Sequence, residues 1–292
     1  MTKSNYIELG ATLFIPATHK DLLEVIEAKK YKNLRSVVID SEDGIDSKKL
    51  DIAIKSIKNT LIKFTHSSCL VFIRPRDVNM LKKLLTFEGI DKIDGFVLPK
   101  FSLSNAYSYL KITGTNYAIM PSIEGEELFD VEKLSELKDI LLHYKDQIIT
   151  IRFGLEDMLR QLSMRRKCEH SIFDMSVTSS VLGNFIAIFK SAGFNISAGV
   201  YPCFKDSKGF ENDVLRDLQE GLFTKTIIHP NQIEIIEEQY KVTWEEFNEA
   251  CEIYGNSDSI FNQNDKMAER DTMSPYSLEI IKRAEVYGIK GV

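Results

Sequence analysis

The sequence predicts an α/β protein built as a TIM (β/α)8 barrel, and two observations support the prediction. Short apolar runs rich in β-branched residues alternate along the chain with polar turns and segments of helical period. Eight such units occur before residue 241, the number that closes a barrel. A doubly wound open sheet with fewer strands is the structural alternative, and the number of units favours the barrel.

The expected strands are short and apolar on both faces, as strands buried in a parallel sheet must be. Val37, Val38 and Ile39 form one such run, and Ile227 and Ile228 form another. The eight expected strands are 11–17, 36–40, 69–74, 95–99, 117–123, 148–153, 195–201 and 225–229.

The segments between these strands carry the apolar stripe of helices that cover a sheet. Leu50, Ile54, Ile57 and Leu61 show the stripe clearly. The expected helices are about 19–31, 47–64, 78–87, 102–112, 130–145, 172–192, 208–222 and 231–240.

The pattern changes after residue 240. An amphipathic helix led by Trp244 is followed by a polar stretch over 255–265 and a last helix over about 276–287, with no strand signal. We therefore expect a catalytic barrel over 1–240 and a helical C-terminal extension over 241–292, packed on the barrel or on a neighbouring subunit.

The composition is that of an ordinary globular protein, with 43% hydrophobic and 27% charged residues among 292. Lys and Arg number 37 against 43 Asp and Glu, and the resulting charge of −6 gives no global field for nucleic acid. No apolar run approaches the length of a membrane span, and the first residues do not resemble a signal peptide. We expect a cytoplasmic protein with no nucleic-acid or membrane partner.

Four cysteines lie far apart and form no CxxC pair. In a cytoplasmic protein this pattern predicts four reduced thiols, and structural zinc is not expected. The four are Cys69, Cys168, Cys203 and Cys251.

Acids and basic residues follow the expected strands, where the catalytic groups of a barrel gather. In chain order these residues are Asp40, Glu42, Arg74, Arg76, Lys100, Glu124 and Asp157. Several carboxylates without clustered His or Cys favour a hard cation such as Mg²⁺ over zinc. Glu124 and Asp157, after adjacent strands, suit Mg²⁺, and Arg74 is placed to hold a substrate carboxylate through two hydrogen bonds.

Some of these residues have a second interpretation. Acids at strand ends often cap the following helix, and we expect this role for Asp43, while Asp40 and Glu42 remain open between capping and catalysis. Arg76 is either a surface cation or a substrate ligand. Lys100 either neutralises the acidic rim or binds substrate.

At these residues the sequence resembles the citrate lyase β-subunit-like family, within the HpcH/HpaI aldolase and citrate lyase superfamily. The similar segments occur in the family's order and span about residues 11–240. They are 13–17, 38–44, 72–75, 95–100, 122–124, 153–157 and 225–233.

The resemblance implies a TIM barrel, commonly a homotrimer, with Mg²⁺ held by Glu124 and Asp157. It also implies that Arg74 binds a carboxylate or carbonyl oxygen of the substrate. Known members form or cleave carbon–carbon bonds in 3-hydroxyacyl compounds, often CoA thioesters, or in related hydroxy-keto acids, through an enolate that a cation and a guanidinium stabilise. A C-terminal acid of a neighbouring subunit is implicated, and Glu269 and Asp271 are its candidates here.

Three positions depart from the family pattern. Gly125 stands where Thr or Ser is usual, Ala198 stands where Asp is usual, and Arg76 stands near a usual Asn. The departures weaken the expectation of acyl-CoA or citrate-type substrates. The additional Arg76 and Arg152 point to a more anionic substrate, for example a phosphorylated acid.

The sequence therefore predicts a Mg²⁺-dependent carbon–carbon lyase or aldolase for a hydroxy-acid, keto-acid or acyl-CoA-type substrate. Glu124 and Asp157 hold the metal, Arg74 stabilises the enolate, and Asp40 or Glu42 moves the proton. Arg74, Arg76, Lys100 and Glu124 are the expected substrate ligands. Two alternatives remain: a barrel without activity that serves as a binding or scaffold subunit, and a metal-assisted thioester hydrolase.

Overall fold

The computed structural model describes residues 6–263 and 265–291, and the chain divides into two compact units. The first unit is Met1–Ile233 and the second is Glu234–Val292. Within the described residues, no helix combines the length and the apolar character needed to cross a membrane.

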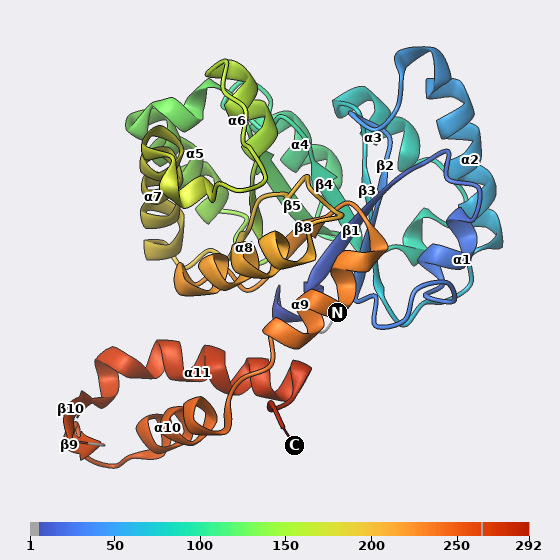
Figure 1. Ribbon diagram of the computed structural model, residues 1–292. Coiled ribbons are helices and arrows are strands. Elements are labelled where there is room, and N and C mark those ends of the chain that lie inside the picture. Colours follow the sequence, from blue (N-terminus) through green and yellow to red (C-terminus); the bar gives the residue numbers. More distant parts are fainter. Residues whose placement is uncertain (1–5, 264, 292) are drawn as a thin grey trace. The chain divides into compact units, whose positions relative to one another are not determined.

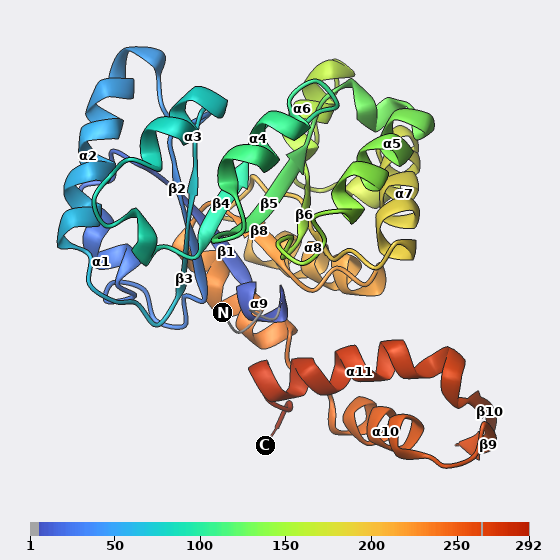
Figure 2. The same ribbon diagram turned by 180° about the vertical axis from the view of Figure 1, so that it is seen from behind.

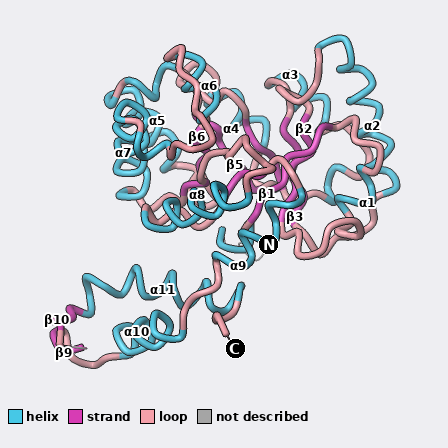
Figure 3. The backbone as a smooth tube through the Cα atoms, in the orientation of Figure 1, coloured by secondary structure: helices cyan, strands magenta, loops and turns pink. Residues whose placement is uncertain are grey.

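The first unit contains eight parallel strands in a closed ring, shown in magenta in Figure 3. Each strand pairs with the next along the chain, and β1 also pairs with β8. A bridge between Ala198, just after β7, and Lys225 of β8 closes the ring. The predicted barrel is confirmed, and the open sheet is excluded. The strands are β1 (Ala11–Pro16), β2 (Ser36–Asp40), β3 (Leu70–Arg74), β4 (Gly95–Leu98), β5 (Ala118–Ile123), β6 (Ile151–Phe153), β7 (Ile196–Ser197) and β8 (Lys225–Ile227).

Helices surround the strands of this unit (Figures 1 and 2). Aspartates cap several of them: Asp77 accepts a hydrogen bond from Met80 N, and Asp130 accepts from Glu132 N and Lys133 N. The helices are α1 (Leu22–Ile26), α2 (Leu50–Lys63), α3 (Val78–Leu84), α4 (Ala106–Thr113), α5 (Val131–Leu142), α6 (Leu155–Gln161), α7 (Ser176–Ser191) and α8 (Ser207–Gln219), and α9 (Ile233–Gln239) begins at the division between the units.

Two helices differ from the sequence prediction. The first ends at Ile26, well before residue 31, and Ala28 adopts a left-handed backbone (φ 55°) that an α-helix does not allow. Helix α6 was not predicted. It begins directly after Gly154 and carries Glu156 and Asp157 in its first turn, where acidic side chains interact favourably with the helix dipole.

Polar side chains occupy the inner face of the barrel. Arg74 of β3 and Arg152 of β6 come from strands that are not neighbours, yet both guanidinium groups lie over the ring of Phe14 on β1, at 5.2 Å and 4.8 Å from its centroid. Only the inside of a closed barrel brings these strands together. Since side chains alternate along a strand, Asp40, which is in register with Arg74, also faces inward.

An ionic cluster on the outer face ties the last strand to its neighbours. Lys225 is 1% exposed, and its Nζ donates to Gly199 O at 2.9 Å, to Asp213 Oδ2 at 2.8 Å and to Asp217 Oδ2 at 2.5 Å. Arg166 also donates to Asp213. Burial raises the pKa of Asp217 to about 7, although Lys225 opposes the shift. The Arg166 guanidinium is buried against Asp213.

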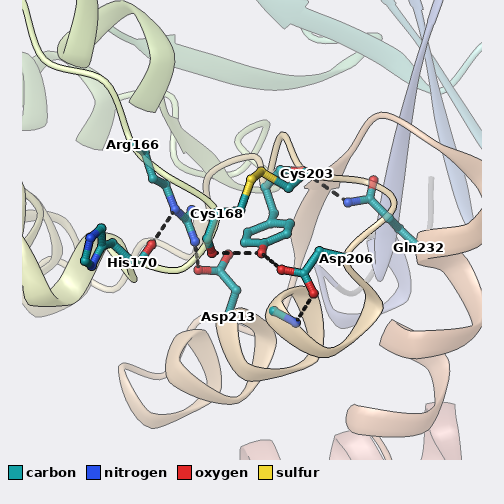
Figure 4. Close-up of a disulfide and its surroundings, with 9 residues drawn as sticks. Arg166, Cys168, His170, Cys203, Asp206, Asp213 and Gln232 are labelled. Carbon is teal, nitrogen blue, oxygen red and sulfur yellow. Dashed lines mark hydrogen bonds and ion pairs between the residues drawn. A yellow bond between two sulfur atoms is a disulfide. The ribbon is translucent and has the colours of Figure 1, made fainter.

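A disulfide joins the loop after α6 to the loop after β7 (Figure 4). Its cysteines are Cys168 and Cys203, with Cα atoms 5.9 Å apart. Tyr201 Oη donates to Cys168 O at 3.1 Å and to Asp206 Oδ2 at 2.9 Å beside it. The prediction of four reduced thiols is therefore wrong for this pair, which only the fold brings together, whereas Cys69 and Cys251 are free thiols.

The second unit contains two helices joined by a small hairpin. Helix α10 (Trp244–Gly255) and helix α11 (Arg270–Tyr287) flank the antiparallel strands β9 (Ile260–Gln263) and β10 (Lys266–Glu269). Thr243 caps α10 in a reciprocal pair with Glu246. The hairpin corrects the expectation that this part of the chain holds no strand. Its strands are four residues long, too short to show the alternation on which the prediction relied.

The buried cluster predicts a large effect of Lys225→Met on stability. The change leaves Asp213 and Asp217 without their shared cation, and we expect the free energy of unfolding to fall by about 3–5 kcal/mol in urea denaturation. Lys241→Met is the matched control, because Lys241 pairs with Glu238 near the surface and its loss should cost about 0.5 kcal/mol or less. Equal effects of the two substitutions would contradict the structural role of the cluster.

Candidate functional site

An arginine clamp forms where β2 and β3 end. Arg74 Nε donates to Asp40 Oδ1 at 2.7 Å, and Nη2 donates to Oδ2 at 2.8 Å. The same carboxylate accepts from Glu42 N at 3.0 Å and from Gly44 N at 2.9 Å. A Cβ on Gly44 would lie 2.6 Å from Asp40 Oδ2, so this turn requires glycine. The two-point pairing fixes the plane and the position of the guanidinium.

Glu42 lies beside the clamp and is 3% exposed. Its Oε1 accepts from Lys100 Nζ. Its Oε2 lies 3.0 Å from Arg74 Nη1 but accepts no hydrogen bond from the described residues. Burial raises the pKa of Glu42 to about 7, against the opposing charge of Arg74 and the hydrogen bond from Lys100. A carboxyl group with a pKa near neutrality can both accept and release a proton.

The neighbouring Asp43 contacts the same cations instead of capping a helix. It lies 3.3 Å from Lys100 Nζ and 3.7 Å from Arg74 Nη1. The cap is Asp46, which accepts from Lys48 N at 2.8 Å. The expectation of a cap at Asp43 is therefore wrong, and three acidic side chains surround the Arg74 and Lys100 charges.

Glu124 follows β5 and is held by the backbone of the loop after β4. Its Oε1 accepts from Lys100 N at 2.6 Å, and Ser122 Oγ donates to its Oε2 at 3.2 Å. Lys100 has a left-handed backbone (φ 47°), uncommon for a residue with a side chain, and this residue directs its N–H to Glu124. Burial raises the pKa of Glu124, and the charge of Asp157 raises it further.

Asp157 lies in the first turn of α6. Its Oδ1 accepts from Arg160 Nη2 at 2.5 Å and from Nε at 3.1 Å. Gly154 allows the helix to start against Glu124, because a Cβ there would lie 2.1 Å from Glu124 Cβ. Gln161 Nε2 joins the two segments by donating to Glu124 O at 2.6 Å and to Asp157 O at 3.2 Å.

These carboxylates fit one way of binding a metal. Over residues 6–263 and 265–291, no group of three or more His, Cys, Asp or Glu side chains could hold an ion, so a cage made only of protein ligands is absent. Mg²⁺ usually takes one or two carboxylates and completes its shell with water and substrate. Glu124 and Asp157 match that number of carboxylates, and burial and the charge of Asp157 both raise the pKa of Glu124, effects that a bound cation would offset.

The remaining predicted residues lie in two places. Arg76 is half-buried and donates to Ile45 O at 3.4 Å. Glu269 ends β10, and Asp271 lies in the first turn of α11, so both belong to the second unit. Asp271 Oδ1 accepts from the adjacent Arg270 Nε at 3.0 Å.

Sequence reasoning missed three residues that shape the site. Ser122 could have been found, because it precedes Glu124 by two residues and so shares its face of the strand. Gly154 and Gln161 carry no chemical signal of their own. Their roles arise from the packing of α6 against Glu124.

A family model described as a C–C bond lyase of the TIM-barrel fold matches residues 3–289. The chain belongs to this family. The (3S)-malyl-CoA thioesterase of Cereibacter sphaeroides is 23% identical over 230 residues, which cover 77% of this chain and 74% of that protein. Citrate lyase subunit beta of Escherichia coli K12 is 24% identical over 157 residues, or 51% of this chain and 50% of that subunit.

Solved structures of similar proteins support the TIM-barrel fold. The protein CitE of Mycobacterium tuberculosis, in complex with magnesium, acetoacetate and coenzyme A, has a TM-score of 0.71 and 17% identity, covering 94% of this chain and 98% of that one. A citrate lyase from Burkholderia xenovorans LB400 has a TM-score of 0.76 and 16% identity, covering 96% and 92%. At these identities the likeness establishes the fold alone.

The burial of Glu42 predicts a measurable titration near neutral pH. In carboxyl ¹³C NMR, Glu42 should titrate with a midpoint of about 7, assigned by its loss in Glu42→Gln. Lys100→Met should raise the midpoint further, because it removes a cation that favours the charged carboxylate. Lys133→Met is the control, since that lysine pairs with Glu126 instead. A midpoint near 4.5 in the unsubstituted protein would disprove the described environment.

Proposed function

We propose that the protein is a Mg²⁺-dependent carbon–carbon lyase or aldolase that acts on a hydroxy-acid, keto-acid or acyl-CoA-type substrate. The observation that carries the proposal is the Arg74 guanidinium, clamped by Asp40 beside two buried carboxyl groups, Glu42 and Glu124, whose pKa values are raised. Membership in the lyase family supports the reaction class.

Glu124 and Asp157 would hold the metal in this proposal. When bound, Mg²⁺ would supply positive charge that stabilises the negative charge developing on a substrate oxygen as the carbon–carbon bond breaks. Ser122 and the backbone N–H of Lys100 orient Glu124, and Gln161 fixes the backbone on both sides of the pair.

Arg74 stabilises the enolate oxygen. Its hydrogen bonds to Asp40 use two of the five N–H donors of a guanidinium, so donors remain for the substrate. Because Asp40 holds the group before the substrate arrives, no reorganisation is needed as charge develops. Asp40 is thus a positioning residue.

Glu42 moves the proton. In the cleavage direction the substrate hydroxyl loses its proton, the electron pair of the carbon–carbon bond passes to the enolate fragment, and the enolate carbon is then protonated. Both oxygens of Asp40 are committed to Arg74 and backbone N–H groups, which favours Glu42 over Asp40 for this role. Lys100 Nζ donates a hydrogen bond to Glu42, and this contact favours the charged carboxylate. An acid of a neighbouring subunit in a homotrimer, Glu269 or Asp271, is the candidate for the second proton.

Thioester hydrolysis on the same residues is the second candidate. The similarity to (3S)-malyl-CoA thioesterase favours it. Product analysis with a 3-hydroxyacyl-CoA of the malyl type separates the two reactions, because cleavage of the carbon–carbon bond releases a shorter acyl-CoA and a keto acid, whereas hydrolysis releases free CoA thiol and the intact acid.

Neutral substitutions of the two carboxylates test the metal proposal. Glu124→Gln and Asp157→Asn each remove a charged ligand, and we expect Mg²⁺ affinity in calorimetric titration to fall by at least about 100-fold, more than changes in outer-shell residues usually cause. Far-UV circular dichroism should remain unchanged. Glu126→Gln is the matched control, because Glu126 is exposed and pairs with Lys133. Wild-type Mg²⁺ affinity in both site variants would refute the assignment.

A further inference from the structure

A second arginine lies inside the barrel, deeper than the clamp. Arg152 occupies the inner face of β6 and is 4% exposed. Its Nη2 donates to Thr226 Oγ1, its Nη1 lies 3.7 Å from Met120 Sδ, and its Cζ lies 4.8 Å from the Phe14 ring centroid. Both contacts of the guanidinium nitrogens are with neutral atoms.

Arg152 differs in its charge balance from Arg74 and Arg166, two other arginines of the first unit. Arg74 pairs with Asp40 and Arg166 with Asp213, whereas Arg152 forms no ion pair with any carboxylate in 6–263 or 265–291. Burial lowers its pKa to about 9, and the charge of Arg74 lowers it further while the charge of Glu124 opposes the shift. The group still carries its proton at neutral pH. An unpaired buried charge is costly to a fold, and its retention calls for a partner.

Arg152 lies beside the residues of the proposed reaction centre. Arg152 is in register with Ser122 of β5 and Ser197 of β7, two small hydroxyl residues. Ser122 also donates to Glu124, and Arg152 shares the Phe14 ring with Arg74. A small substrate held by Arg74 and Glu124 would therefore have its other end near Arg152.

We propose that Arg152 binds a second anionic group of the substrate, a carboxylate or a phosphoryl group, and so selects a dianionic acid over a monoanionic one. The inference rests on the proposed function, because it takes the reacting end of the substrate to lie at Arg74 and Glu124. At least three of the five guanidinium N–H donors are not used by Thr226 and Met120, enough for a bidentate contact to such a group.

A purely structural role for Arg152 makes the opposite prediction for stability. If the side chain only held Phe14 and Thr226 in place, Arg152→Met would lower the Tm of the ligand-free protein. If the charge is kept for a ligand, removing it relieves an unpaired buried cation, and the Tm should rise by about 2–4 °C. Arg216→Met, on the outer helix α8 and beside Asp174, is the control and should leave dianion binding unchanged.

The binding test uses three 2-oxo acids that differ only at C3: pyruvate, oxaloacetate and phosphonopyruvate. In calorimetric titration with Mg²⁺ we expect at least one dianion to bind 10-fold or more tightly than pyruvate, and the tighter of the two identifies the group as carboxylate or phosphoryl. Arg152→Met should abolish this preference while pyruvate affinity stays within about twofold, and Arg152→Lys should keep part of it. Absence of a preference, or its persistence in Arg152→Met, would overturn the proposal.

A Mg²⁺-free titration separates this inference from the proposed function. If the protein binds no Mg²⁺ yet oxaloacetate or phosphonopyruvate still binds in an Arg152-dependent way, the anion site stands and the lyase proposal fails. If Mg²⁺ binds through Glu124 and Asp157 but Arg152→Met prefers the dianions over pyruvate as strongly as the unsubstituted protein does, the lyase proposal stands and the anion site fails.

Discussion

The paired hydrogen bonds between Arg74 and Asp40 are the contact on which the rest of the site depends. They exist because β2 and β3 lie in a register that places the two residues opposite each other at the ends of their strands. The same carboxylate orders the turn after β2 through Glu42 N and Gly44 N, and this turn brings Glu42 to Arg74 and Lys100. A single ion pair thus positions both the guanidinium and Glu42, the residue that we propose moves the proton.

Buried charged side chains lie both outside and inside the ring of strands. Outside the strands, Lys225, Arg166, Asp213 and Asp217 form an ionic cluster that joins β8 to α8 and to the loop after β7. Inside, Glu42 has a buried oxygen without a hydrogen bond from the described residues, and burial raises its pKa to about 7. In the outer cluster, Arg166 Nη1 and Asp217 Oδ1 also have no hydrogen-bond partner among the described residues, and the pKa of Asp217 is raised to about 7 as well. The two groups differ in position: the inner residues lie at the carboxyl ends of the strands, where the catalytic residues of barrel enzymes gather.

The sequence was sufficient to predict the barrel, because the alternation of strands and helices is a local pattern. It also indicated which polar residues lie at the ends of the strands, because their positions follow directly from the strand boundaries. It could not distinguish the roles of Asp40 and Glu42, because the distinction depends on which carboxylate accepts the two hydrogen bonds of Arg74. Contacts between distant segments were also out of reach: Cys168 with Cys203, and Arg166 with Asp213, depend on the packed fold. The hairpin over 260–269 was missed because short strands carry little periodicity.

The central claim is that this rim stabilises an enolate, and exchange of substrate protons for deuterium measures it without knowledge of the full substrate. In D2O with Mg²⁺, ¹H NMR should show loss of the methyl protons of pyruvate or of acetyl-CoA, the fragments that such a cleavage leaves as enolates. Chelation of Mg²⁺ or Arg74→Met should reduce the exchange to the rate in buffer, because each removes charge that stabilises the enolate oxygen. If neither compound exchanges above that rate, or if Arg74→Met exchanges as fast as the unsubstituted protein, the account is contradicted.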